Sequence, residues 1–195
     1  MIQKTLLILI FLTNYSFAQI TGQKISEAAI SIIDPSIVYD GKYVALAYPN
    51  GDVDPKTGVC TDVVIRTYRK LGIDLQKEIH EDMKANFSLY PNQKRWGLRS
   101  TDKNIDHRRV PNQEVFFTRK GKKLKATTNP IDYKPGDLVT WLIGGKLDHI
   151  GVVTHKKSSD GKRPLIVHNI GGGQILEDCL LTYNITGHYR FIPNK

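Results

Sequence analysis

The change from helical to strand-like apolar spacing along the chain is the feature that most limits its fold. From Cys60 onward, Val63, Val64 and Leu71 recur at helical spacing, and Gly72 ends the pattern. After residue 135, short apolar runs separated by turn residues predict strands at 138–142, 149–154, 165–169 and 188–191. Helices followed by closely spaced strands predict an α+β domain, with N-terminal helices packed on an antiparallel β-sheet.

Weaker patterns predict the remaining elements. A short helix is expected at 26–33, and a second helix opens with Asp74 as N-cap and stops before Pro91. The segment 96–111 is polar and predicted to be irregular. Brief extended pieces are expected at 43–48, 115–118 and 124–127.

The N-terminus has the order of features found in a secretory signal peptide. Lys4 precedes the apolar run 6–12, and Ser16-Phe17-Ala18 places small residues at the two positions that a signal peptidase reads. We therefore expect cleavage after Ala18, leaving one domain at 19–195 in the periplasm or outside the cell. Gln19 follows rather than a cysteine, so the lipid of a lipoprotein is not indicated. The alternative is a buried N-terminal helix.

Net charge and the length of apolar runs limit the partners that this chain can be expected to have. The 195 residues carry a net charge of +9, and loss of Lys4 with the leader leaves +8. No apolar run approaches the roughly 18–20 residues of a membrane-spanning helix, so stable membrane insertion is not expected. The basic charge favours anionic partners such as cell-wall polymers. Nucleic acid is not expected, because the charges are scattered and no binding motif accompanies them. We expect a monomer without a cofactor.

Cys60 is the candidate nucleophile. Thr57 can cap the helix that begins at or just before Cys60, so the sulfur lies in the first turn, where unpaired backbone N–H groups and the helix dipole favour negative charge. This environment lowers a thiol pKa, and the same N–H groups can receive the oxyanion of an attacked carbonyl. With only two cysteines, a disulfide-stapled scaffold is excluded, but a Cys60–Cys179 disulfide remains an alternative.

Two histidines on a predicted hairpin are the candidate base and orienting group. His149 opens one strand and His168 ends the next, and the turn 157–161 lies between them. Pairing that keeps the two residue numbers at a constant sum of 317 places the imidazoles opposite each other. Neighbouring strand residues point to opposite faces, so either His168 or Asn169 faces His149, and the pairing favours His168. Purely structural roles for these histidines are the alternative.

The sequence also offers candidate metal ligands and candidate substrate contacts. A zinc site made of Cys60, His149 and His168 lacks the usual ligand spacing, so no metal is expected. Arg108 and Arg109 can hold a substrate carboxylate in bidentate fashion, and internal pairing with Asp106 or other acids is the alternative.

The motifs also carry a resemblance to a known family. Gly58-Val59-Cys60-Thr61-Asp62, 135–139, 148–153 and 167–169 resemble the ordered signatures of NlpC/p60 cysteine peptidases, which are papain-like. More closely, 28–191 resembles the bacterial domain of unknown function 1287 through stretches such as GVCTDVVIRTYRKLGIDLQ, NIDHRRVPN, DYKPGDLVTW and VHNIGGG. The usual NlpC/p60 motif has Asp before the cysteine, where this chain has Val59.

The resemblance implies a papain-like NlpC/p60-type fold and a Cys-His-polar triad that cleaves amide bonds, commonly in peptidoglycan peptides. On that basis Cys60 is the nucleophile, His149 the base and His168 the orienting group of an exported amidase or endopeptidase. The candidate substrate-binding residues are Asp62, Arg108, Arg109 and Asn169. The same triad also suits an acyltransferase or lipase-like enzyme, and a non-catalytic cell-wall-binding module is the third possibility.

Overall fold

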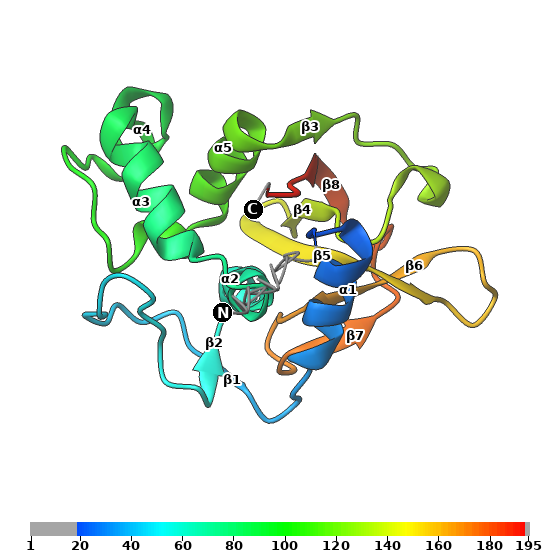
Figure 1. The fold of residues 1–195 in the computed structure, drawn as a ribbon. Coiled ribbons are helices and arrows are strands. Elements are labelled where there is room, and N and C mark those ends of the chain that lie inside the picture. Colours follow the sequence, from blue (N-terminus) through cyan, green and yellow to red (C-terminus); the bar gives the residue numbers. More distant parts are fainter. Residues whose placement is uncertain (1–18, 194–195) are drawn as a thin grey trace, which may run out of the picture.

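The computed structural model describes residues 19–193 and contains one six-stranded antiparallel sheet with helices on one side (Figure 1). The strand order is β3-β8-β4-β5-β6-β7. The strands are β3 (Lys122–Leu124), β4 (Leu138–Ile143), β5 (Leu147–Lys157), β6 (Pro164–His168), β7 (Ile175–Glu177) and β8 (Asn184–Arg190). A separate parallel pair joins β1 (Val38–Tyr39) to β2 (Thr57–Gly58). The predicted α+β class is therefore confirmed.

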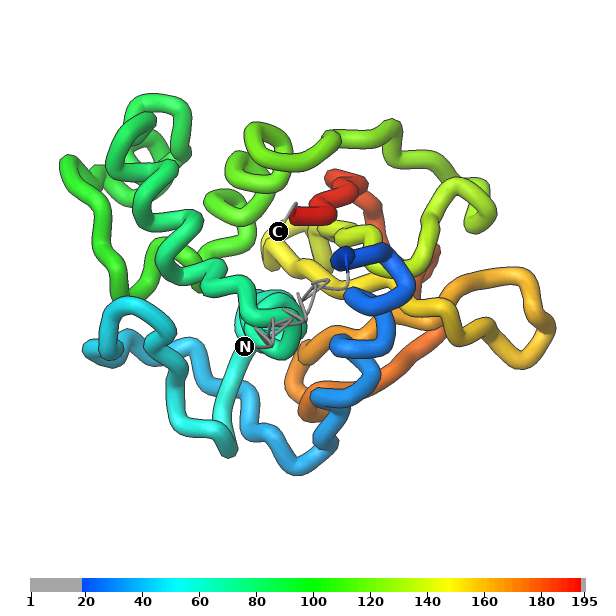
Figure 2. Tube along the Cα trace, in the orientation of Figure 1, coloured from blue at the N-terminus to red at the C-terminus, as the bar shows by residue number. Residues whose placement is uncertain are grey.

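The helices pack on the sheet around a central helix, α2. The helices are α1 (Gly22–Ser31), α2 (Cys60–Lys70), α3 (Leu75–Ala85), α4 (Asn92–Trp96) and α5 (Val110–Lys120), with 3-10 turns at Phe87–Leu89, Asp106–Arg108 and Pro130–Asp132. In Figure 1, α2 lies between α3 and α1; both α1 and α2 pack on β5, and α5 packs against β3 and β8. The trace from α1 to α2, in blue and cyan in Figure 2, runs along the lower border of the view and carries β1.

The two faces of the sheet bury different sets of apolar side chains. Toward the helices, Ile150 and Val152 of β5 pack with Val63, Val64 and Tyr68 of α2. On the other face, Trp141, Val153, Ile166, Cys179 and Leu180 form a second, smaller cluster. This alternation along the strands follows from the two-residue period of a pleated sheet. It gives the end of β5 that carries His149 a rigid support on both sides.

The two main predicted helices begin where the sequence placed them. The Asp62 carboxylate accepts a hydrogen bond of 2.7 Å from the Val59 backbone N–H, which fixes the start of α2 at Cys60. The expected cap Thr57 was wrong: Val59 is the N-cap, and Thr57 lies in β2. Asp74 is the N-cap of α3 and accepts from the Lys77 N–H at 3.2 Å. Gly72 follows α2 with φ of 73°, a left-handed conformation that suits glycine at a helix C-terminus.

Several weaker predictions were wrong. The expected strand at 115–118 is part of α5. This helix has Pro111 in its first turn and buries both Phe116 and Phe117. The segment 43–48 forms no strand, β7 was not predicted, and α1 begins four residues earlier than expected. The predicted signal peptide 1–18 lies outside the described residues. Among the helices that the structure describes, none has the length and apolar character needed to cross a membrane.

Candidate active site

Cys60 is the first residue of α2 and lies beside a cavity of about 300 Å³. Its side chain is buried, and Tyr39, Trp96 and Arg109 also line the cavity. Tyr39 comes to this position because β1 pairs in parallel with β2, with Tyr39 opposite Gly58. The pKa of Tyr39 is raised to about 12 by burial, by the nearby Cys60 and Asp62, and by a hydrogen bond with Cys60. Tyr39 is thus a site residue that the sequence analysis missed.

Burial, rather than the helix dipole, dominates the state of the Cys60 thiol. Burial raises the pKa of Cys60 to about 12, and the charge of Asp62 acts in the same direction. The backbone N–H groups of Ile150, Thr61 and Cys60 itself lower it, but by less. The sequence-based expectation of a lowered thiol pKa was therefore wrong. At neutral pH the resting group is a thiol, so a base must remove its proton during attack.

The two predicted histidines meet. His149 Nε2 lies 2.8 Å from His168 Nδ1, and the ring centroids are 5.1 Å apart. Their strands pair in a register shifted from the predicted one: Val152 is opposite Val167, so the paired numbers add up to 319 and His168 faces Gly151. A shift of two residues keeps a side chain on the same face, and diagonal neighbours remain within reach. Asn169 instead donates to the Gly58 carbonyl at 3.1 Å.

Glu177 extends this pair at its far end. Its Oε2 lies 2.8 Å from His168 Nε2, because β7 pairs with β6 and places Ile175 opposite His168. The carboxylate can only accept, so His168 donates from Nε2 and accepts at Nδ1, and His149 donates from Nε2. In this arrangement His149 Nδ1 carries a free lone pair. Glu177 had no sequence signal, since its strand was not predicted.

The free nitrogen of His149 is buried. Within the part of the chain that the structure describes, Nδ1 has no hydrogen-bond partner, including the Cys60 sulfur. The thiol is nevertheless close to β5, since the N–H of Ile150, the next residue after His149, acts on its pKa. Trp141 packs against the His149 ring with centroids 5.8 Å apart. Burial, followed by the neighbouring His168, lowers the pKa of His149 to about 3, so its ring is neutral at pH 7.

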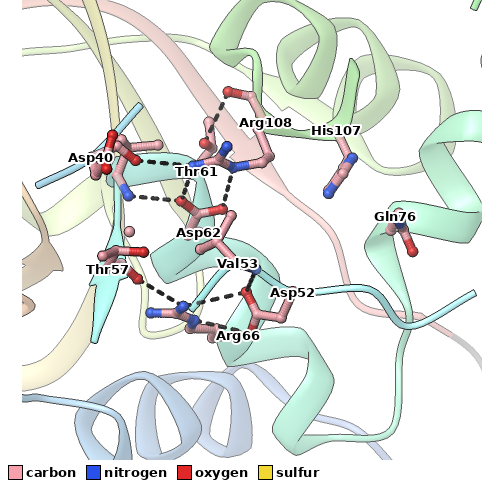
Figure 3. Close-up of polar contacts among 12 residues, drawn as sticks. Asp40, Asp52, Val53, Thr57, Thr61, Asp62, Arg66, Gln76, His107 and Arg108 are labelled. Atoms are coloured by element: carbon pink, nitrogen blue, oxygen red, sulfur yellow. Dashed lines mark hydrogen bonds and ion pairs between the residues drawn. The ribbon is translucent and has the colours of Figure 1, made fainter. Parts of the chain in front are cut away.

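Two of the four predicted substrate-binding residues form a buried ion pair (Figure 3). Arg108 donates to both carboxylate oxygens of Asp62 at 2.9 Å, and each side chain is 2% exposed. The Arg108 guanidinium also donates to the backbone carbonyls of Asp40 and Lys42 at 3.2 Å. These contacts hold the segment that follows Tyr39 against the start of α2.

Arg109 has one face toward the cavity. It pairs with Asp106 at 3.0 Å, and its guanidinium lies 4.3 Å from the centroid of the Trp96 ring. Lys146 and Asp148 also line this cavity. Of the predicted residues, Cys60, Arg108 and Arg109 therefore line the cavity, whereas Asp62 and Asn169 make internal contacts.

The second cysteine is not bonded to the first. Both Cys60 and Cys179 are free thiols, so the alternative of a disulfide between them was wrong. Cys179 instead lies behind the histidine pair, with its sulfur 3.6 Å from His168 Nε2.

Comparisons with known proteins place the chain among relatives. The profile described as Domain of unknown function (DUF1287) matches residues 26–191. The uncharacterized protein YijF of Escherichia coli (strain K12) is 47% identical over 171 residues, which cover 88% of this chain and 82% of that protein. Among solved structures, NlpC1 from Trichomonas vaginalis is similar with a TM-score of 0.49 and 14% identity. That alignment covers 93% of this chain and 49% of NlpC1, so this chain spans about half its length.

Proposed function

The chain belongs to the family of Domain of unknown function (DUF1287), and we propose that it is a cysteine hydrolase that cleaves amide bonds of peptidoglycan peptides. The observation that carries the proposal is the ordered chain His149–His168–Glu177, which leaves one buried nitrogen of His149 unpaired. The backbone N–H of the next residue, Ile150, acts on the Cys60 thiol, and the approach of the sulfur to the free nitrogen is part of the proposal. A buried, unpaired polar atom is costly, and a proton-accepting role is a reason to retain it. The proposed site of action is the periplasm or the cell exterior.

In the proposed mechanism, the thiol proton of Cys60 moves to His149 Nδ1 as the sulfur attacks the carbonyl carbon. The imidazolium that forms donates from Nε2 to His168, which donates to Glu177, so the new positive charge faces a carboxylate. The oxyanion lies at the start of α2, where backbone N–H groups and the Tyr39 hydroxyl are available as donors. Nδ1–H then protonates the leaving amine, and a thioester with Cys60 remains. Water, deprotonated by His149, hydrolyses the thioester.

The cavity next to Cys60 suits a peptide that carries a free carboxylate. Arg109 and Lys146 supply positive charge there, and Trp96 supplies a flat apolar wall. A guanidinium held by Asp106 and stacked on a ring loses little freedom when it binds a carboxylate.

We therefore predict that Arg109→Gln weakens cleavage of muropeptides with free carboxylates about 10-fold in kcat/KM, the loss expected for one charge-assisted hydrogen bond. The same variant should cleave carboxamide-blocked muropeptides as wild type does. Arg163→Gln, which changes a partly exposed arginine that pairs with Asp178, is the matched control. Equal losses on free and blocked substrates would contradict a carboxylate-binding role.

The central test compares wild type with Cys60→Ala and Cys179→Ala on purified sacculi and muropeptides, with products identified by mass. We expect new amide-cleavage products from wild type and Cys179→Ala and none from Cys60→Ala. Because the two thiols are both buried, Cys179→Ala controls for the loss of a packed sulfur. Negligible release by all three proteins on a broad panel would refute the hydrolase and favour a wall-binding module. Products that carry a transferred acyl group would identify an acyltransferase with the same triad.

A further inference from the structure

Cys179 is a buried thiol that the proposed reaction does not use. Its sulfur lies 3.6 Å from His168 Nε2, and the same nitrogen lies 2.8 Å from Glu177 Oε2. The three potential ligand atoms all lie within 4.8 Å of one another. Cys179 belongs to the second, smaller apolar cluster and His168 is fully buried, whereas the Glu177 side chain is 46% exposed and opens the three-residue cluster to solvent.

These donors are of the types that zinc prefers. Zn²⁺ binds cysteine sulfur at about 2.3 Å, histidine nitrogen at about 2.0–2.1 Å and carboxylate oxygen at about 2.0–2.2 Å, usually as a tetrahedron. Tetrahedral angles at those bond lengths separate sulfur from nitrogen by roughly 3.5 Å, close to the 3.6 Å observed. The nitrogen and oxygen must part by roughly 0.5 Å from their hydrogen-bonded 2.8 Å, which the half-exposed Glu177 side chain permits.

We propose that His168, Glu177 and Cys179 form a binding site for a Zn²⁺ ion, with the fourth position open to water. His149 supplies the outer contact that metal-bound histidines usually have, because it bonds to the nitrogen of His168 that faces away from the ion. The site is separate from the Cys60 cavity but shares His168 with the histidine pair.

Zinc at this site switches the histidine pair into the other tautomer; this consequence rests on the proposed function. The ion takes the lone pair of His168 Nε2, so the proton of His168 resides on Nδ1 and is donated to His149 Nε2. His149 then carries its own proton on Nδ1, the atom that must accept from Cys60. Each imidazole keeps one proton, and the Cys179 thiol releases one to solvent as the zinc–sulfur bond forms. Zinc therefore inhibits the hydrolase.

The binding test uses the whole mature protein and Co²⁺ as a spectroscopic substitute for Zn²⁺. We expect wild type and Cys60→Ser to bind one Co²⁺ with sulfur-to-cobalt charge-transfer absorption, which added Zn²⁺ removes. Cys179→Ser should lose the absorption and bind Zn²⁺ at least ~100-fold more weakly by calorimetry. Asp178→Asn, next to Glu177 but outside the cluster, should bind as wild type does. Loss of the absorption in Cys60→Ser instead, or an unchanged signal in Cys179→Ser, would overturn the site.

The inhibition test separates the two proposals. Cys179→Ser is expected to keep wild-type muropeptide cleavage and to require at least ~100-fold more Zn²⁺ for half inhibition. Equal sensitivity of the two proteins would refute the link between the site and the histidine pair. If no protein cleaves any substrate, the proposed function fails, whereas the cobalt spectra still decide the metal site. Thermal unfolding of each variant confirms that it is folded.

Discussion

Glu177 acts on the histidine pair through its charge. It is the only carboxylate in contact with the histidine pair among the described residues, and it fixes which nitrogen of each ring carries the proton. Replacing it with an amide of the same size preserves packing but removes the charge that stabilises the imidazolium formed during attack. The orienting role therefore predicts a loss in turnover rather than in folding.

We predict that Glu177→Gln lowers kcat for muropeptide cleavage 10- to 100-fold, roughly the cost of removing the outer partner of a functional histidine. KM should change little, because Glu177 lies outside the Cys60 cavity. Asp178→Asn is the control, since this neighbouring acid pairs with Arg163 on the surface. Steady-state kinetics with the zinc chelated decides the question, and a variant as active as wild type would show that His168 needs no carboxylate.

The buried ion pair between Asp62 and Arg108 stabilises the fold. Removing one partner leaves the other as a buried, unpaired charge, which costs about 3–5 kcal/mol. We predict a loss of that size in the free energy of unfolding for Arg108→Met, measured by urea denaturation. Arg163→Met removes an arginine from exposed ion pairs and should cost no more than about 1 kcal/mol. Similar losses in both variants would mean that burial of the Asp62–Arg108 pair has no special energetic weight.

At the scale of elements, local sequence signals predicted where helices begin, whereas the contacts between distant segments depend on strand pairing that the sequence did not reveal. The start of α2 at Cys60 and the N-cap Asp74 were predictable, because capping and helical spacing act within a few residues. A strand was expected at 115–118 because Val, Phe and Thr favour strands. The prediction was wrong because burial of Phe116 and Phe117 in the core favours a helix here. Tyr39 and Glu177 escaped prediction because pairings of β1 with β2 and of β6 with β7 bring them to the site.

Gly151 links the register of β5 and β6 to the histidine pair. A Cβ added there would lie 2.6 Å from Ile166 Cγ2 and 3.2 Å from His168 Cβ. The closer approach is too short for an ordinary contact, so the Ile166 side chain must shift, and the His168 Cβ and the Val167 carbonyl oxygen, each at 3.2 Å, are crowded as well.

We predict that Gly151→Ala costs about 1–3 kcal/mol of stability and lowers kcat by separating His168 from His149. Gly172→Ala is the matched control: the added Cβ would come no closer than 3.7 Å to Ile175, and the effect on either measurement should be small. Urea unfolding and muropeptide kinetics report the two effects separately. Wild-type stability and turnover in Gly151→Ala would show that the close packing of β5 on β6 is not needed.

Across the whole molecule, buried carboxylates join elements that are distant in sequence. Asp82 of α3 pairs with Arg119 and Lys120 of α5, and Asp137 at the entry to β4 pairs with His188 and Arg190 of β8. Burial alone would raise the pKa of Asp82, but the hydrogen bonds from Arg119, Tyr90 and Lys120 outweigh it and hold the pKa at about 2. The pKa of Asp137 is also lowered, because His188 and Arg190 overcome the effect of its burial. Both carboxyl groups therefore ionise at lower pH in the folded protein than in the unfolded chain.

Acid should therefore loosen the packing of α3 on α5 in a defined range of pH. A carboxyl whose folded pKa lies below its unfolded value of about 3.9 contributes stability that is complete above about pH 5 and is lost as the pH falls toward 2. We predict that Asp82→Asn is less stable than wild type at pH 6, by on the order of 1–2 kcal/mol after allowance for solvent screening. That difference should shrink toward zero near pH 2, as followed by urea unfolding monitored by circular dichroism. Glu81→Gln, on the exposed side of the same helix, should differ little from wild type at either pH, and a pH-independent deficit in Asp82→Asn would assign its effect to packing instead of charge.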